Sequence, residues 1–268
     1  MANVSLTAAM RSNLLSLQNT QKMMDTTQNR LSTGLKVNSA IDNPSSYFTA
    51  SALNQRAGDL EGLLDSMGQG IQTLKAADEG IKAITNLAEQ AKAVANQWAD
   101  TSDATLQGKY EDQYKEIITQ INELAKDSGY KGKNLLGGDA LTVKFNELTG
   151  TDTTKIEITG VDASAVTGLG MTATIGTNIE TEIDAITDAI TTLRGFASDF
   201  GNAYSIVQNR EEFTENLINV LTEGADKLTL ADMNEESANM LALQTRQQLG
   251  VNSLSLASQA AQSVTRLF

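Results

Sequence analysis

Apolar residues recur three and four positions apart along most of this chain, and this spacing limits its fold more than any other feature. The longest run leads from Leu53 to Trp98 with a mean period just under 3.5 residues. A period below 3.6 predicts helices that wind around one another in a left-handed supercoil. The members of this run are Leu53, Ala57, Leu60, Leu64, Met67, Ile71, Leu74, Ala77, Ile81, Ile84, Ala88, Ala91, Ala95 and Trp98.

Glycines interrupt this long helical pattern. Each costs about 0.5–1 kcal/mol relative to alanine inside a helix, so the helix is weak alone and needs tertiary packing. The glycines are Gly58, Gly62, Gly68, Gly70 and Gly80.

Both ends of the chain show the same spacing. At the amino-terminal end the apolar seam is Met10, Leu14, Leu17, Met24, Leu31 and Leu35, with Gln21 and Gln28 filling its two gaps. At the carboxy-terminal end it is Met240, Leu243, Gly250, Leu254, Ala257, Ala261, Val264 and Phe268. The two seams predict one amphipathic helix at each end.

The middle of the sequence predicts two more helices and a β-hairpin. The shorter helix has Leu106, Tyr110, Ile117, Ile121 and Leu124 on one face. Period-two alternation in LTVKFNEL (141–148) and TKIEITGVD (154–162) predicts the hairpin. The second long helix has the seam Ile179, Ile183, Ile186, Ile190, Leu193, Ala197, Phe200, Tyr204 and Val207, which then shifts phase to Phe213, Leu217 and Val220.

Two breaks separate the end helices from the long helices. In LKVNSAIDNPSSYF (35–48) stands Pro44, the only proline. Gly34 suits a helix C-cap, Asn43 an N-cap and Pro44 the first position of a helix. Two interpretations stay open here, an ordinary loop or a connection between two layers of an assembly. The second predicted break is TEGADKLTLADMN (222–234), where Asp232 suits an N-cap.

Composition excludes several kinds of function. The sequence contains neither Cys nor His, which removes disulfides, thiol nucleophiles, imidazole bases and the usual zinc ligands. We therefore expect that the chain is not an enzyme and that it binds neither a metal ion nor a cofactor. A net charge of −13 argues against binding nucleic acid or an anionic membrane through a basic surface. The amino terminus has neither the basic start nor the apolar run of a cleaved secretory signal.

Charge also differs along the chain. Residues 1–36 contain four basic side chains and one acidic side chain. Residues 225–268 contain three basic and four acidic side chains. Nearly neutral ends can pack against copies of themselves without like-charge repulsion. Two isolated amphipathic helices are too marginal to hold together well as a pair, so both ends are expected to pack between molecules.

Three stretches resemble bacterial flagellins. The conserved amino-terminal flagellin region is similar to LSTGLKVNSAIDNPSSYFTASALNQRAGDLEGLLDSMGQGIQTLKAADEGI (31–81) and YKGKNLL (130–136). The carboxy-terminal region is similar to LADMNEESANMLALQTRQQLGVNSLSLASQ (230–259). The resemblance covers about the first 135 and the last 90 residues. It implies a subunit of the flagellar filament with only a short middle segment.

The resemblance also implies an arrangement of parts. Residues 1–36 and 231–268 are expected as an inner-core coiled coil, 44–221 as an outer-shell helical bundle with its hairpin at about 140–176, and 37–43 and 222–230 as connecting spokes with Gly34, Asn38, Asn43 and Pro44. Inner-core polymerisation is expected at Met10, Leu14, Leu17, Met24, Leu31, Leu243, Leu254, Ala257, Ala261, Val264 and Phe268. Shell packing is expected at Leu53, Leu60, Leu64, Met67, Ile71, Leu74, Ile81, Ile84, Ile183, Ile186, Ile190, Leu193 and Phe200.

The implied partners are many copies of the chain, a flagellar secretion chaperone, the export apparatus, and the filament cap and junction proteins. The implied location is the extracellular filament. The stretch EQAKAVAN (89–96) departs from flagellins that a vertebrate innate immune receptor detects, with Gln90, Ala93 and Val94 at positions that there carry an arginine, a glutamate and a leucine. Two alternatives remain, the hook–filament junction protein of the same family and a secreted coiled-coil adhesin or effector.

Overall fold

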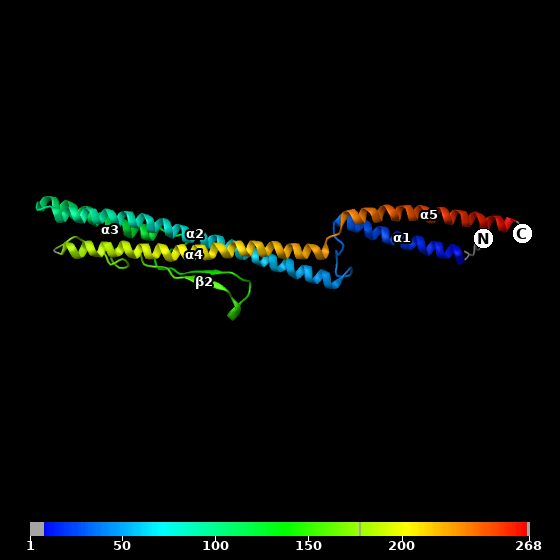
Figure 1. Cartoon of the computed structure of the whole chain (residues 1–268), viewed down its shortest axis with the longest axis horizontal. Coiled ribbons are helices and arrows are strands. Elements are labelled where there is room, and N and C mark those ends of the chain that lie inside the picture. Colours follow the sequence, from blue (N-terminus) through cyan, green and yellow to red (C-terminus); the bar gives the residue numbers. More distant parts are fainter. Residues whose placement is uncertain (1–7, 177, 267–268) are drawn as a thin grey trace. The chain divides into compact units, whose positions relative to one another are not determined.

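The structure is a computed structural model that describes residues 8–176 and 178–266, except the side chains of residues 9, 261, 262 and 264–266. Long helices and one small antiparallel sheet make up the chain, which confirms the mainly α fold with a β-hairpin (Figure 1). The elements are α1 (Ala8–Thr33), α2 (Pro44–Asp100), α3 (Ala104–Asp127), β1 (Leu141–Lys144), a 3-10 turn (Gly150–Asp152), β2 (Lys155–Ile158), α4 (Ile179–Thr229) and α5 (Met233–Arg266).

The chain divides into two compact units. The terminal unit contains Met1–Gln55 and Val220–Phe268, and the central unit contains Arg56–Asn219. In the central unit α2 and α4 run antiparallel, since Lys92 Nζ donates to Thr187 Oγ1 at 2.8 Å while Gly68 of α2 lies beside Glu211 of α4. Apolar side chains of α2, α3 and α4 join those of the hairpin in one core.

The buried face of helix α3 agrees only in part with the predicted one. Its buried residues are Tyr114, Ile118, Ile121 and Ala125. Of the predicted residues Ile121 is buried, Ile117 and Leu124 are half-buried against the core, Tyr110 is half-buried and Leu106 is exposed. The Tyr114 side chain explains the difference. Its ring is fully buried and its hydroxyl donates to the Thr172 carbonyl at 3.1 Å, so an aromatic residue with a polar tip turns this face inward.

The hairpin is present but its strands are shorter than predicted. Leu141 pairs with Ile158 and Lys144 with Lys155. Val143 and Ile158 are buried and belong to the same core as the helices. The hairpin therefore contributes one apolar face to the helical core.

Helix α4 differs from the prediction in two ways. The phase shift is wrong, because Phe213 and Val220 are exposed while Thr214 and Leu221 are buried. The predicted break over 222–234 is present but much shorter, because α4 continues to Thr229 and α5 begins at Met233. Ala225 is completely buried, and this packing keeps the segment helical in spite of its glycine.

Candidate assembly surface of the terminal helices

Helices α1 and α5 of the terminal unit lie side by side (Figure 1). Arg30 Nη1 contacts Glu236 Oε1 at 2.8 Å, and Gln247 Nε2 donates to Gln21 Oε1 at 2.8 Å. Residue numbers rise along one helix as they fall along the other, so the two helices are antiparallel.

A glycine permits close approach further along this pair. A Cβ atom at Gly250 would lie 2.7 Å from Leu17 Cδ2, closer than real Cβ atoms come to a neighbour. The absence of a side chain at 250 therefore lets α5 pack directly on Leu17.

The inward face of α1 differs in part from the predicted seam. Met10 is buried and Leu17, Met24 and Leu31 are half-buried, but Leu14 is exposed. The polar positions of the seam are Thr20 and Thr27, both buried, in place of the predicted Gln21 and Gln28. The polar residues that interrupt the apolar seam of α1 thus lie one position earlier in the sequence than predicted.

On α5 the predicted seam residues face α1 as far as the described side chains extend. Leu243 is buried, and Leu254 and Ala257 are half-buried. Phe268 and the side chains of Ala261 and Val264 lie outside the described residues.

The connection from α1 to α2 is built from helix caps, as predicted. Gly34 has a φ of +73° and its N–H donates to the Arg30 carbonyl at 2.8 Å, so it is the C-cap of α1. Asn43 Oδ1 accepts from the Ser46 N–H at 3.2 Å, and α2 begins at Pro44. These capping predictions are confirmed.

Asp42, which the sequence analysis missed, holds the turn inside this connection. Its Oδ2 accepts from the N–H groups of Ser39 at 2.9 Å and Asn38 at 3.1 Å. Both hydrogen bonds lower the pKa of the Asp42 carboxyl below its ordinary value, and the bond from Ser39 has the larger effect. A short Asp side chain three residues after a Ser is the signal that could have identified this turn.

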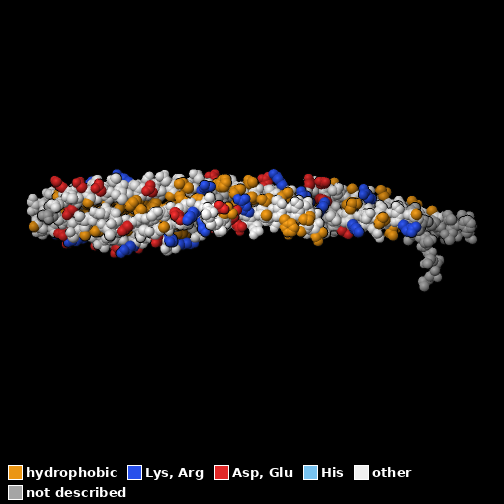
Figure 2. Space-filling view, turned by 90° about the horizontal axis from the view of Figure 1, so that it is seen from below, with side chains coloured by type: hydrophobic (Ala, Val, Ile, Leu, Met, Phe, Trp, Pro, Cys, Tyr) orange, Lys and Arg blue, Asp and Glu red, His pale blue; other side chains and the backbone are white. Residues whose placement is uncertain are grey.

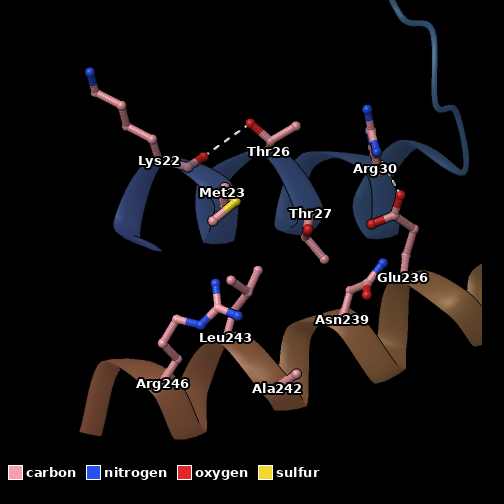
Figure 3. A pocket seen from close by; sticks show the side chains of 10 residues that line it. All are labelled: Lys22, Met23, Thr26, Thr27, Arg30, Glu236, Asn239, Ala242, Leu243 and Arg246. Carbon is pink, nitrogen blue, oxygen red and sulfur yellow. Dashed lines mark hydrogen bonds and ion pairs between the residues drawn. The ribbon is translucent and has the colours of Figure 1, made fainter. Parts of the chain in front are cut away.

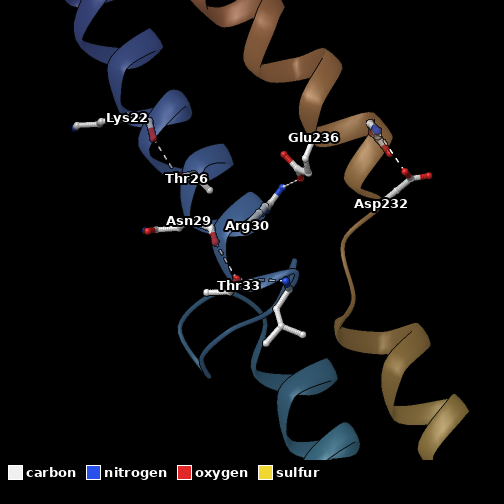
Figure 4. Close-up of polar contacts among 9 residues, drawn as sticks. Lys22, Thr26, Asn29, Arg30, Thr33, Asp232 and Glu236 are labelled. Carbon is white, nitrogen blue, oxygen red and sulfur yellow. Dashed lines mark hydrogen bonds and ion pairs between the residues drawn. The ribbon is translucent and has the colours of Figure 1, made fainter.

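The two connections lie against each other. Leu35 and Leu230 form an antiparallel bridge, and the Lys36 N–H donates to the Thr229 carbonyl at 2.8 Å. The Ala231 N–H donates to the Gly34 carbonyl at 2.9 Å. Figure 4 shows the neighbouring polar contacts, with Asp232 at the start of α5 and Arg30 reaching Glu236. Asp232 Oδ1 accepts from the Asn234 N–H at 2.9 Å, which confirms it as the N-cap.

Large apolar side chains of the terminal helices face outward. Leu241 is 66% exposed, Leu249 62% and Leu256 67% on α5, and Leu15 is 60% exposed on α1. Figure 2 shows apolar side chains reaching the surface among charged ones on the face it presents. An exposed apolar surface on a helix pair is typical of an interaction site.

The predicted shell-packing residues lie on the inner faces of α2 and α4. Leu53, Leu64 and Ile183 are half-buried; buried are Leu60, Met67, Ile71, Leu74, Ile81, Ile84, Ile186, Ile190, Leu193 and Phe200. Of the positions that correspond to the immune-receptor site, Gln90 and Ala93 are exposed and Val94 is half-buried against the core.

The described residues hold no group of three or more Asp and Glu side chains arranged to bind a metal ion. Within the same part of the chain, no helix is both long and apolar enough to cross a membrane. Long paired helices with outward apolar side chains, in a sequence without His or Cys, are typical of a structural protein that associates through its surfaces.

Comparisons with known proteins identify the family. A model of the bacterial flagellin N-terminal helical region matches residues 4–140, and a model of the C-terminal helical region matches residues 183–268. A flagellin of Brucella melitensis biotype 1 is 30% identical over 283 aligned residues, covering 100% of this chain and 99% of the relative. Flagellin FljM of Caulobacter vibrioides is 30% identical, with 95% of both chains covered.

Flagellin C of Rhizobium meliloti is 26% identical, and the alignment covers 100% of this chain and 99% of that flagellin. The chain belongs to the bacterial flagellin family. It is a structural subunit of the flagellar filament and not an enzyme, and the matches do not favour the junction protein or an adhesin.

Proposed function

We propose that the chain polymerises through its terminal helices, with residues 1–36 and 231–268 in the inner core of the filament and 44–221 in the outer shell. Residues 37–43 and 222–230 would connect the two layers, the second as the helical end of α4. The observation that carries the proposal is the outward face of α5, where three leucines are more than half exposed.

A layer of two helices can bury only one face of each helix. The inward faces of α1 and α5 meet each other, so the outward leucines need another surface. Apolar burial contributes about 25 cal/mol per Å², and contacts with several neighbouring copies would combine many small contributions. Copies of the same chain supply such surfaces repeatedly along a filament.

Membership of the flagellin family suggests the remaining partners. We propose that the chain leaves the cell through the flagellar export apparatus with the help of a secretion chaperone, and adds to the filament beneath a cap after junction proteins. Its location would be the extracellular filament.

Removal of both terminal segments tests the proposed assembly. Residues 37–230 alone should fail to polymerise when filament fragments are added as seeds, whereas the full chain should polymerise, as measured by sedimentation and electron microscopy. Normal filaments from the truncated chain would contradict an inner core built from the two ends.

We also propose weak or absent activation of the vertebrate flagellin receptor. Gln90 and Ala93 place an amide and a methyl group on the surface of α2 where receptor-detected flagellins carry charged side chains. A reporter-cell assay with purified monomer should give little signal, and restoring Gln90→Arg and Ala93→Glu together should raise it. Strong activation by the unchanged chain would refute the proposal.

A further inference from the structure

The turn between α1 and α2 presents an isoleucine to solvent. Ile41 is 94% exposed, more than any other large apolar side chain among the described residues. The Asp42 N–H closes this turn by donating to the Ser39 carbonyl at 3.1 Å, and Asp42 Oδ2 accepts from the Ser39 N–H at 2.9 Å. Turns favour Gly, Pro, Asn, Asp and Ser, so turn chemistry does not explain an isoleucine at this position. The hydrogen bonds fix the turn, which lowers the entropy that docking of its tip would cost.

The central unit contains an apolar groove between α2 and α4, with a volume of about 450 Å³. Leu74 and Phe200 contribute apolar lining and are almost completely buried, and Tyr204 contributes its ring. Gly201 keeps the groove open, because a Cβ atom there would meet no atom within 4 Å among the described residues. The groove therefore offers an apolar side chain a place out of water.

The groove also carries one cation without an acidic partner. Lys82 Nζ lies 2.6 Å from Asp78 Oδ2 and 2.9 Å from Glu79 Oε1, so both acidic side chains of the lining are already paired. Lys75 Nζ lies 5.8 Å from the centroid of the Tyr204 ring. No carboxylate of the described residues lies within ion-pair distance of Lys75, which therefore favours a carboxylate from outside.

The isoleucine turn supplies a carboxylate directly beside its tip. Asp42 is exposed and uses only Oδ2 for its bonds with the described residues of the turn. Its Oδ1 remains available to a cation. Ile41 and Asp42 together thus complement the apolar lining and the unpaired Lys75 of the groove in both hydropathy and charge.

The groove between α1 and α5 of the terminal unit fits such a tip less well. Figure 3 shows its lining, which includes four charged side chains, namely Lys22, Arg30, Glu236 and Arg246. An apolar side chain bound there would take charged groups out of water, which is costly. The apolar lining therefore favours the groove of the central unit.

We propose that Ile41 of one copy binds in the groove between α2 and α4 of another copy, with Asp42 paired to Lys75 there. The proposal rests on the filament function, which supplies the second copy. One surface of each copy then meets a different surface of the next, and a contact of this heterologous kind can extend into an open filament. It adds to that function a contact that involves neither α1 nor α5.

Ile41→Ser tests the tip of the turn. Serine suits a turn and removes the apolar side chain, which is exposed in the monomer. Loss of one buried isoleucine should raise the critical concentration for seeded polymerisation by about tenfold to hundredfold, while the thermal unfolding of the monomer stays the same. An unchanged critical concentration would overturn the proposal.

Gly201→Leu tests the groove, and Gly195→Leu is its matched control. Both glycines are exposed in α4, and a Cβ at either meets no atom within 4 Å among the described residues. Both variants therefore gain the same helix propensity. Gly195 lies about a third of a turn around the helix from Gly201 and does not line the groove. The proposal requires Gly201→Leu to raise the critical concentration more than Gly195→Leu does, and equal values would contradict it.

Cross-linking locates the contact directly. The chain contains no Cys, so the variants Ile41→Cys and Gly201→Cys each carry a single thiol. The first variant, labelled with ¹⁵N, and the second, unlabelled, are polymerised together with unmodified chain on filament seeds and treated with a short bismaleimide. Mass spectrometry then identifies the cross-linked peptides.

A cross-link between positions 41 and 201 must join two copies, because neither variant has both thiols. Such cross-links in filaments, but not in the unpolymerised mixture, support the proposal. Filaments that contain both variants and give no cross-link between these positions overturn it. Failure of the unmodified full chain to polymerise on seeds would instead contradict the filament function itself, so the two failures are distinguishable.

Discussion

Gly80→Ala should destabilise the central unit even though alanine is the better helix former. Gly80 lies within α2 and is buried. A Cβ atom there would overlap Ser128 Oγ and would lie 2.7 Å from both Leu136 Cδ1 and Ser128 Cβ. The Ser128 N–H donates to the Leu124 carbonyl at 3.1 Å, and Ser128 Oγ donates to the same carbonyl at 2.6 Å. The serine is thus fixed at the end of α3.

Two effects of opposite sign determine the magnitude. Replacing a helical glycine by alanine gains about 0.5–1 kcal/mol. Overpacking a close contact costs about 1–3 kcal/mol. Gly62→Ala isolates the first effect, because Gly62 lies in the same helix and a Cβ there meets no atom within 4 Å among the described residues. The difference between the two variants is therefore the packing cost alone, about 1–3 kcal/mol.

Thermal unfolding followed by far-UV circular dichroism measures this difference. Each kcal/mol moves Tm by about 2–4 °C for a domain of this size. Gly62→Ala should raise Tm slightly and Gly80→Ala should lower it by several degrees. Equal shifts in the same direction would show that α3 and the loop at Leu136 are not packed on Gly80.

Two further predictions concern single polar groups. Tyr114→Phe removes the hydrogen bond to the Thr172 carbonyl and should cost about 1 kcal/mol, seen as a lower denaturant midpoint with an unchanged slope; an unchanged midpoint would contradict it. Because the pKa of Asp42 is lowered in the fold, its contribution is present above the ordinary Asp pKa and is lost as pH falls through the lowered value. The protection factors for amide exchange at Asn38 and Ser39, which compare the observed rate with the intrinsic rate at the same pH, should therefore fall on acidification, and Asp42→Asn should remove that pH dependence.

Helix boundaries with local capping chemistry could be predicted from the sequence. Gly34, Asn43 and Pro44 each need only their immediate neighbours to favour a cap, and all three stand where predicted. Gly224 shows the limit of such reasoning. It lies inside α4, where a Cβ would sit at ordinary contact distance, 3.6 Å, from Leu53 Cδ1. Packing between residues far apart in sequence overrides the glycine there.

Polar residues on buried faces could not be predicted from apolar spacing. Thr20 Oγ1 donates to the Ser16 carbonyl of its own helix at 2.9 Å, so the hydroxyl is satisfied while the methyl group faces the partner helix. Thr214 is buried in a similar way in α4. The apolar spacing had instead predicted Phe213 as the inward residue. Glu236 was missed for the same reason, since its burial depends on Arg30 of a helix more than 200 residues away.

The terminal unit buries few apolar side chains among its described residues. They are Met10, Val37, Ala50, Leu221, Ala225 and Leu243, and none of these six is aromatic. Ordering each residue costs about 1–2 kcal/mol of backbone entropy, whereas a buried leucine returns about 1.5–3 kcal/mol. In the proposed assembly, neighbouring copies cover the outward leucines of α5, so we expect the folding of both helices to be coupled to the addition of each subunit. Backbone amides of α1 and α5 should exchange rapidly in the monomer and slowly in the filament; equally slow exchange in both would show that the helix pair is stable without neighbours.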